Sequence, residues 1–302
     1  VGAGQTYLTI TDAVNAYNNS CLSGPVTFAL TDFSYGPSEV FPIIISNPTA
    51  SAINTLTIKP NGGVTTTITT AVGSTADAIF KFNGADYVTI DGSNNGSSSR
   101  NLTITNTSGT SPNILLIGST GTTPITDVTV KNCILINGVN TSSGILVSDG
   151  AIPGSAGYFY DITIQNNSIQ KSWIALYCRA ANVGNNGNGL TITSNDLTTS
   201  GANAIRRVGI YVQDVYGAMI SNNTIANFET ATTEFDMGVW FAAGTRNSTV
   251  TGNTISNLAY TGASNTGPNG IFVSTNTDNS NLVISNNTIT NISSVGSVPS
   301  GG

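Results

Sequence analysis

A short pattern of alternating apolar and polar residues recurs along the second half of the chain. Its clearest copy is residues 161–169, in which Ile162 and Ile164 alternate with polar residues, two asparagines follow, and Ile169 closes the pattern. Alternation with a period of two is typical of a β-strand with one buried face. The pattern therefore predicts a strand, an Asn-rich turn and the beginning of a second strand.

The copies return about every 30 residues. Their central apolar positions are Val130, Ile164, Ile192, Ile220, Val250 and Ile284, separated by 34, 28, 28, 30 and 34 residues. A repeat of this length is typical of a solenoid, because each unit is too small to bury its apolar face alone and must stack on its neighbours. We expect one elongated all-β domain built as a parallel β-helix.

The N-terminal third is less regular. Residues 9–19 have helical spacing, with Ile10, Ala13, Val14 and Tyr17 on one face and Thr11 as a candidate N-cap. A helix placed there would cover the open edge of the first coil. Strand candidates follow at residues 26–30, 40–45, 56–58, 65–70, 79–82 and 87–90. We expect an N-terminal cap region (1–25), irregular first coils (26–100), regular coils (101–292) and a tail or linker (293–302).

Several segments of this region carry a family resemblance. They are residues 4–14 (GQTYLTITDAV), 26–28 (VTF) with Tyr35 and Gly36, 56–60 (LTIKP) and 83–92 (NGADYVTIDG). Together they resemble the beginning of right-handed parallel β-helices of the pectin-lyase-like superfamily. More narrowly, they resemble β-helix modules of large secreted surface proteins from gliding, Bacteroidetes-type bacteria. The resemblance covers essentially the whole chain and implies the fold. Activity is not implied, since the superfamily includes lyases, hydrolases, esterases, adhesins and tailspikes.

Aligning the copies places asparagines in two columns. One contains Asn132, Asn166, Asn222 and Asn286, and its neighbour contains Asn167, Asn195, Asn223, Asn253 and Asn287. Stacked strands lie about 4.8 Å apart, so identical amides on successive coils are able to hydrogen-bond along the stack. Asn also tolerates the left-handed backbone of turns. We interpret both columns as structural ladders.

Composition narrows the functional classes. Only 8% of the 302 residues are charged, there is no His, and the net charge is −6. A chain so poor in Lys and Arg is not expected to bind nucleic acid. No apolar run approaches the roughly 20 residues of a membrane span. Cys21, Cys133 and Cys178 lack the spacing of a metal site, so we expect buried free thiols, no metal and no cofactor.

A second strand in each coil presents aromatic residues. Registering the coils places Tyr177, Tyr211, Trp240 and Phe272 at one outward position, after Leu146 in the preceding coil. The position two residues before each of these five is occupied by a small residue: Gly144, Ala175, Gly209, Gly238 and Gly270. We expect these small residues to form a smooth floor beside the rings. Aromatic faces favour the C–H faces of sugars. The face is therefore a candidate glycan-binding groove, unless loops cover it or the glycines serve a bend.

Catalytic chemistry is restricted by the composition. Without His, Ser-His and Cys-His mechanisms are excluded. Carboxylate pairs or Arg/Lys/Tyr chemistry remain, and the weak candidates are Arg179, Arg206, Arg207, Asp214 and Asp236. Asp214 and Asp236 are seven positions out of register, roughly 20 Å along extended chain. We therefore expect no paired active site.

Two functional hypotheses follow. The first is a non-catalytic extracellular module on a bacterial surface, structural or adhesive, that binds a polysaccharide or surface glycan. The last coil has no evident cap, so further domains or copies of the chain are expected to cover it, with end-to-end assembly into a fibre as one outcome. The second is a polysaccharide lyase or glycoside hydrolase acting along the face from Tyr177 to Phe272.

Overall fold

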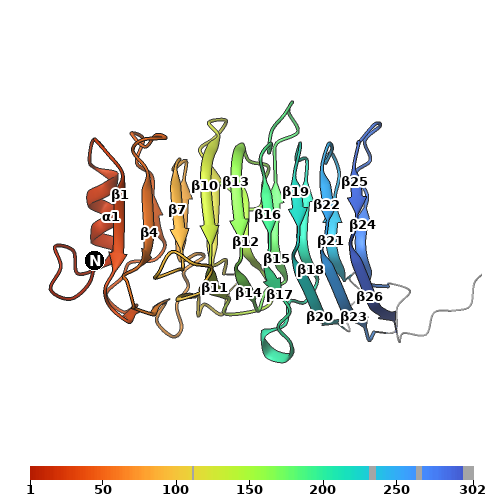
Figure 1. Cartoon of the computed structure of the whole chain (residues 1–302), viewed down its shortest axis with the longest axis horizontal. Helices are drawn as coiled ribbons and strands as arrows, with labels where there is room; N and C mark the ends of the chain where they lie inside the picture. Colours follow the sequence, from red (N-terminus) through yellow and green to blue (C-terminus); the bar gives the residue numbers. More distant parts are fainter. Residues whose placement is uncertain (111, 231–235, 263–266, 295–302) are drawn as a thin grey trace, which may run out of the picture.

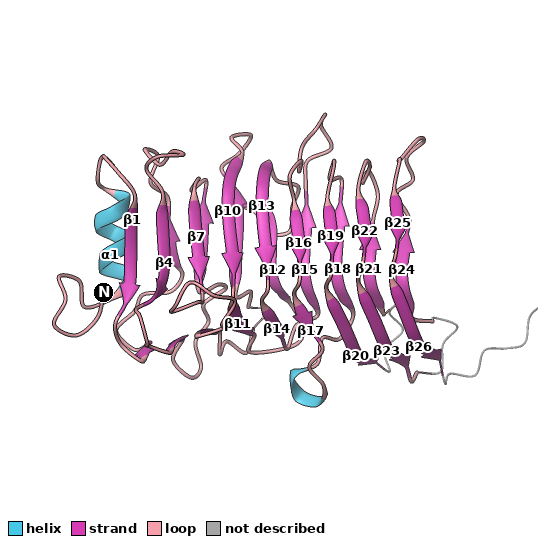
Figure 2. Cartoon of the chain, viewed as in Figure 1, coloured by secondary structure: helices cyan, strands magenta, loops and turns pink. Residues whose placement is uncertain are grey.

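Three parallel sheets run the length of the molecule, and successive coils of the chain contribute one strand to each (Figure 1). This computed structural model describes residues 1–110, 112–230, 236–262 and 267–294. Within these ranges, sheets A and B have nine strands each and sheet C has eight. Neighbouring strands of a sheet are three strands apart in the sequence, so the chain passes from A to B to C in each coil as far as β24 (Figure 2).

The strand bounds show how the coils become regular along the chain. Sheet A contains β1 (Val26–Leu30), β4 (Leu56–Pro60), β7 (Val88–Asp91), β10 (Ile125–Lys131), β13 (Phe159–Gln165), β16 (Thr191–Thr193), β19 (Met219–Ser221), β22 (Thr249–Thr251) and β25 (Val283–Ser285). Sheet B contains β2 (Ser34–Tyr35), β5 (Thr66–Thr69), β8 (Leu102–Thr105), β11 (Cys133–Ile136), β14 (Ser168–Gln170), β17 (Asp196–Leu197), β20 (Thr224–Thr230), β23 (Thr254–Tyr260) and β26 (Thr288–Ser294). Sheet C contains β3 (Ile43–Ile45), β6 (Phe80–Asn83), β9 (Leu115–Ser119), β12 (Ser143–Asp149), β15 (Ile174–Arg179), β18 (Val208–Gln213), β21 (Met237–Phe241) and β24 (Asn269–Val273).

The apolar columns expected from the repeat form the core. Val130, Ile164 and Ile192 pair directly across sheet A and are fully buried, as are Ile220 and Val250 further along. Burial of each such side chain contributes about 1.5–3 kcal/mol. The last coil differs, because Ile284 in the same column is 48% exposed.

The N-terminal helix α1 (Ile10–Asn18) covers the first coil at the red end of Figure 1, as expected. Its buried face consists of the predicted Ile10, Ala13, Val14 and Tyr17. The predicted cap is wrong by two residues: the Oγ1 atom of Thr9 accepts from the N–H of Asp12, at 3.0 Å. Thr11 instead donates to Glu39, whose carboxylate also accepts from the first N–H groups of the helix. The carboxylate of Glu39 thereby joins the helix to the first coil. Its negative charge also interacts favourably with the positive N-terminal end of the helix dipole.

The asparagine columns have different local roles. Asn167, Asn195, Asn223, Asn253 and Asn287, here called the Asn ladder, form continuous side-chain hydrogen bonds of 2.9–3.1 Å between coils. Asn132, Asn166, Asn222 and Asn286 have left-handed backbone with φ of 51–59°, as a sharp turn requires. Amide hydrogen bonds thus join consecutive coils throughout the Asn ladder. In the other column the described residues show one such bond, from Asn166 to Asn132 at 2.8 Å, so that column serves the turn and does not form the expected ladder.

Three local expectations need correction. The strand expected at 40–45 is only Ile43–Ile45, and Val40 before it is exposed. Strand β26 extends to Ser294, so the expected tail boundary at 293 falls inside a strand. All three thiols are free, but Cys21 is exposed and only Cys133 and Cys178 are buried. Among the described residues, no helix is long and apolar enough to cross a bilayer.

Candidate functional site

Four aromatic side chains form a continuous row on the outside of sheet C. Tyr177, Tyr211, Trp240 and Phe272 pair in register on β15, β18, β21 and β24. The two tyrosine rings are stacked, with centroids 4.8 Å apart and an angle of 12° between their planes. The following contacts are edge-on, at 4.9 Å and 5.7 Å. These four residues, here called the aromatic row, are each partly exposed, so their predicted outward position is correct.

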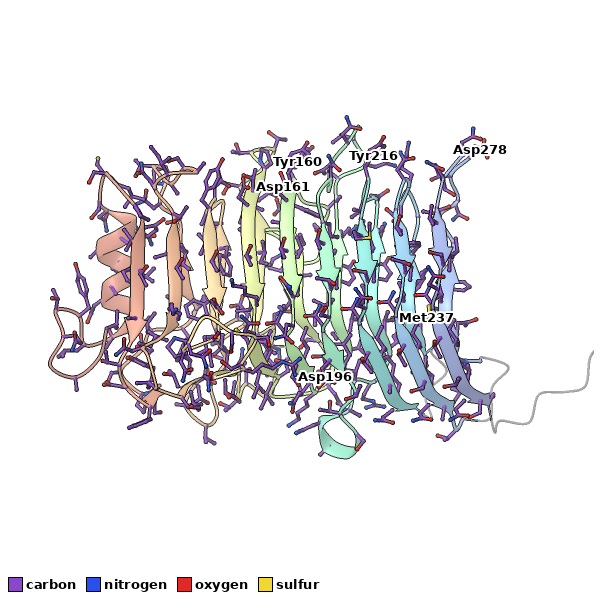
Figure 3. The ribbon with its side chains drawn as sticks, in the orientation of Figure 1. Tyr160, Asp161, Asp196, Tyr216, Met237 and Asp278 are labelled. Carbon is purple, nitrogen blue, oxygen red and sulfur yellow. The ribbon has the colours of Figure 1, made fainter. Side chains whose placement is uncertain are left out.

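A buried apolar layer supports the row. Ile174, Val208 and Met237 open strands β15, β18 and β21, and their side chains pack together and against the rings (Met237 is labelled in Figure 3). Trp173 lies against this layer, and the guanidinium groups of Arg206 and Arg207 lie 5.6 Å and 5.9 Å from its ring centroid. Sequence reasoning missed Trp173 because it precedes the strand and lies outside the aligned column.

The glycine column does not form a floor beside the rings. A Cβ atom placed on Gly209 would lie 3.0 Å from Ile225 Cγ2, and one on Gly238 would lie 2.7 Å from Ile255 Cγ2. Both isoleucines are inward residues of sheet B, and Gly270 meets Ile289 in the same way. The column therefore faces the interior at a corner of the coil, where a side chain has little room. The expected open groove with a glycine floor is wrong, and the bend explains the glycines.

Asp236 lies to one side of the row, immediately before β21. Its side chain is fully buried, and neither carboxylate oxygen has a hydrogen-bond partner in the described structure. Burial raises the pKa of Asp236 to about 8, although the nearby guanidinium groups of Arg206 and Arg207 favour the charged form. The structure thus brings three of the five catalytic candidates together, with a carboxyl group that keeps its proton at neutral pH.

The other two candidates lie at the opposite end of the strands. Burial raises the pKa of Asp214, while the charges of Arg179 and Arg246 lower it. Asp214, Arg246 and Tyr216 line a hollow of about 120 Å³ together with the loop at residues 182–185. Tyr211 connects the row to this end, since its hydroxyl donates to Gln213 at 2.7 Å and Gln213 donates to Asp214 at 3.2 Å.

The two carboxylates do not form a pair. Tyr211 pairs with Trp240, and the N–H of Asp214 donates to the carbonyl of Ala243, so the register expected from the sequence holds. Figure 3 shows their labelled neighbours, Tyr216 and Met237, at opposite ends of the strands. Seven strand positions correspond to roughly 20 Å, beyond the separations of about 5–9.5 Å used in glycoside hydrolysis. These two groups therefore cannot share one glycosidic bond.

A larger hollow on the outside of sheet B was not anticipated. Its volume is about 670 Å³, and it is lined by Ser200, Gly201, Ala204, Asn227, Phe228, Asn257, Ala259, Asn291 and Ser293. Asn227, Asn257 and Asn291 lie in mid-strand with left-handed backbone, and their side chains are hydrogen-bonded along the stack. The sequence signal that could have indicated this hollow is an Asn two residues after Ile225, Ile255 and Ile289, in three consecutive coils. Across the described residues, no group of three or more His, Cys, Asp or Glu side chains is arranged to hold a metal ion.

The fold and the repeated coils define an all-β parallel solenoid with an outward aromatic row. A comparison with protein-family models matches residues 88–302 to the family described as right handed beta helix region. The match covers more than half of the chain, which therefore belongs to this family. Comparisons with curated proteins and with solved structures found no match.

Proposed function

We propose that the chain is a non-catalytic, glycan-binding structural module of a secreted or cell-surface protein, with the aromatic row as its contact surface. The observation that carries the proposal is the register of the four rings on adjacent strands, each partly exposed. Strands of a sheet are about 4.8 Å apart, so the row offers an apolar surface on each of four consecutive coils. A ligand extended along the axis would meet each ring in turn.

Polar groups accompany the rings, as is common in ligand sites. The Tyr211 hydroxyl donates to Gln213 at 2.7 Å, and Trp240 Nε1 donates to Ser274 at 2.8 Å. Arg207 lies 5.8 Å from the Trp240 ring centroid. Aromatic surface with hydrogen-bonding groups at its margins suits a sugar, which has apolar faces and hydroxyl edges. Only a small fraction of the residues in the whole chain are charged. This composition supports a contact surface that is uncharged and not strongly anionic.

The test is retention of the chain on a panel of neutral and acidic polysaccharides by native affinity electrophoresis. We expect Trp240→Ala and Tyr211→Ala to weaken retention about three- to tenfold each, since an aromatic contact contributes about 0.5–1.5 kcal/mol. Tyr160→Ala is the matched control, because Tyr160 is a partly exposed aromatic residue on sheet A. Thermal unfolding confirms that each variant is folded.

Two outcomes would contradict the proposal. One is that none of the polysaccharides retains the wild-type chain. The other is that retention survives both aromatic substitutions but is lost in Asn257→Ala, which would move the contact to the hollow on sheet B.

Polysaccharide cleavage along the same face is a second candidate, favoured by one observation. Asp236 keeps its proton at neutral pH beside Arg206 and Arg207, as a general acid requires. Its full burial opposes this role, because a general acid must reach the leaving oxygen. Assays for new reducing ends and for unsaturated products separate the candidates. Cleavage by the wild type that is abolished in Asp236→Asn would replace the non-catalytic proposal.

A further inference from the structure

The strands that line the larger hollow on sheet B contain another column of asparagines. Asn227, Asn257 and Asn291 have left-handed backbone, with φ of 66°, 54° and 53°, in the middle of β20, β23 and β26. The residues on either side of them pair in register, so the three asparagines lie at equivalent positions on adjacent coils. All three line the hollow, and Asn257 and Asn291 are exposed. These three residues are here called the outer Asn column.

The left-handed residue allows two nearby apolar side chains to face the core. Ile255 and Leu258 are three residues apart, so strict alternation would place them on opposite faces of β23, yet both are fully buried. Asn257 lies between them and is exposed, so the alternation is interrupted there. Strand β20 repeats this arrangement at Asn227. Glycine would satisfy the same backbone, so asparagine adds an amide on the outer face.

The outer Asn column leaves part of its hydrogen-bonding capacity unused within the described structure. An Asn amide has two N–H donors and an oxygen with two lone pairs. Asn257 donates one N–H to Oδ1 of Asn227 at 3.2 Å and accepts one bond from Asn291 at 3.1 Å. In the buried Asn ladder, by contrast, Asn195 donates both N–H groups and its oxygen accepts two bonds. Among the described contacts, one N–H and one lone pair of Asn257 therefore remain for another molecule.

The rest of the hollow combines polar and apolar groups. Its volume of about 670 Å³ lies within the range of about 300–1,000 Å³ that is typical of small-molecule sites. Ser200 and Ala204 line it from the loop that contains the short helix η1 (Gly201–Asn203), which Figure 2 shows in cyan, standing out from the stack near β17. Ala259 lines it from β23, beside the outer Asn column. The described residues that line the hollow carry no charge.

This lining favours one class of ligand. An amide that both donates and accepts is matched by the hydroxyl groups of a sugar or by the amides of a peptide. Successive coils are about 4.8 Å apart, whereas an extended peptide advances about 3.3 Å per residue, so its amides would fall out of step with the column. A pyranose unit is about as long as one coil step, and its C–H groups can pack against Ala204 and Ala259. A strongly anionic ligand would find no cation to pair with among the described lining residues.

We propose that this hollow is a second binding site, which takes a short uncharged saccharide along the solenoid axis. The hydroxyl groups of successive sugar units bond Asn227, Asn257 and Asn291 in turn, and the apolar side of the saccharide lies against Ala204 and Ala259. Because the outer Asn column spans three coils, a trisaccharide has the matching length. The hollow is on sheet B and the aromatic row is on sheet C, so this inference does not depend on binding at the row.

Isothermal titration calorimetry with linear, neutral trisaccharides of glucose, mannose, galactose and N-acetylglucosamine tests the site. We expect at least one of them to bind the wild type, and to bind Asn257→Gly about tenfold more weakly, because this substitution removes two hydrogen bonds to the ligand. Glycine keeps the left-handed backbone that this position requires. Asn222→Gly is the matched control and should bind normally, because Asn222 is exposed and left-handed, with φ of 55°, but is not among the residues that line the hollow.

A second variant tests the space instead of the amides. Ala259→Met places a larger side chain in the hollow and should abolish measurable binding, and thermal unfolding shows whether each variant is folded. The inference is wrong if no trisaccharide binds, or if a folded variant of either kind binds as tightly as the wild type. Binding that is lost when Tyr211→Ala and Trp240→Ala are combined, but kept in the two hollow variants, would also overturn it and would assign the saccharide to the aromatic row. Failure of the row to retain polysaccharides would leave the expected titrations unchanged.

Discussion

Arg100 donates from Nε to the main-chain oxygen of Asn166, 2.9 Å away and 66 residues further along the chain. Its Nη2 also reaches the side-chain oxygen of the same residue at 3.1 Å, and its Nη1 lies 3.5 Å from a carboxylate oxygen of Asp196. One side chain from the loop before β8 therefore contacts the turns of two later coils.

Replacement of Arg100 by Met tests this contact. Met keeps most of the apolar stem but removes all the donors, so we expect the free energy of unfolding to fall by about 1 kcal/mol, since the guanidinium is partly exposed. Hydrogen exchange should rise in the loop at residues 93–99. Arg100→Lys keeps the charge but not the forked geometry, and it should recover only part of the loss. Equal stability of all three proteins would contradict this role.

Asn195→Ala tests the interior of the Asn ladder. The substitution removes the acceptor of Asn167 and the donor to Ile164, leaving buried polar groups without partners. Each such group costs about 1–3 kcal/mol, so we expect a loss of roughly 2–4 kcal/mol in urea unfolding. Asn203→Ala is the matched control, because the contact of its amide with Gln170 is exposed and its loss should cost under about 1 kcal/mol. Similar losses in the two variants would show that burial does not set the cost.

Gly238→Val tests the inward direction of the glycine column. The new side chain would meet the Gly270 carbonyl and Ile255 at 2.5 Å and 2.7 Å, measured from its Cβ. Overpacking of this kind costs about 1–3 kcal/mol. Gly24→Val should be nearly neutral, because Gly24 has open space and no left-handed backbone. A fully stable Gly238→Val protein would restore the interpretation of the column as an open floor.

The burial of Asp236 predicts a dependence of stability on pH. The folded protein holds this proton up to a pKa of about 8, whereas the unfolded chain releases it near 3.8. The stabilising contribution is complete below pH 4 and is lost as the pH rises towards 8, at up to about 1.4 kcal/mol per pH unit. In Asp236→Asn, which cannot ionise, we expect a flatter profile between pH 5 and 8. Urea midpoints at these pH values measure the difference, and parallel profiles would exclude ionisation of Asp236 as the cause.

The sequence predicted the parts of the fold that depend on local pattern. Val130 and Ile164 fall in the core because a strand alternates its faces and the repeat sets the register between coils. The same logic correctly placed Tyr177, Tyr211, Trp240 and Phe272 together on the outside. For such features, a period of two within the strand and a period of about 30 between strands are sufficient.

Features that depend on departures from the pattern were missed or misplaced. Val208, Gly209 and Ile210 are all buried, so strict alternation fails at the corner and the glycines were assigned to the wrong side. The raised pKa of Asp236 results from its burial, opposed by the charges of Arg206 and Arg207, and no strand pattern specifies these surroundings. The hollow beside Asn257 is lined by left-handed residues in mid-strand, which interrupt the alternation that sequence reasoning assumes.

The stacking of parallel coils also determines how the module would respond to a pulling force. The hydrogen bonds between strands run along the solenoid axis, so tension between the two ends would load them one coil at a time rather than all together. Each released coil, of 28 to 40 residues, would add roughly 100–140 Å of extended chain. A module of this design is stiff against bending but lengthens in successive steps when its ends are pulled apart, and so would absorb a sudden load without losing the whole fold at once.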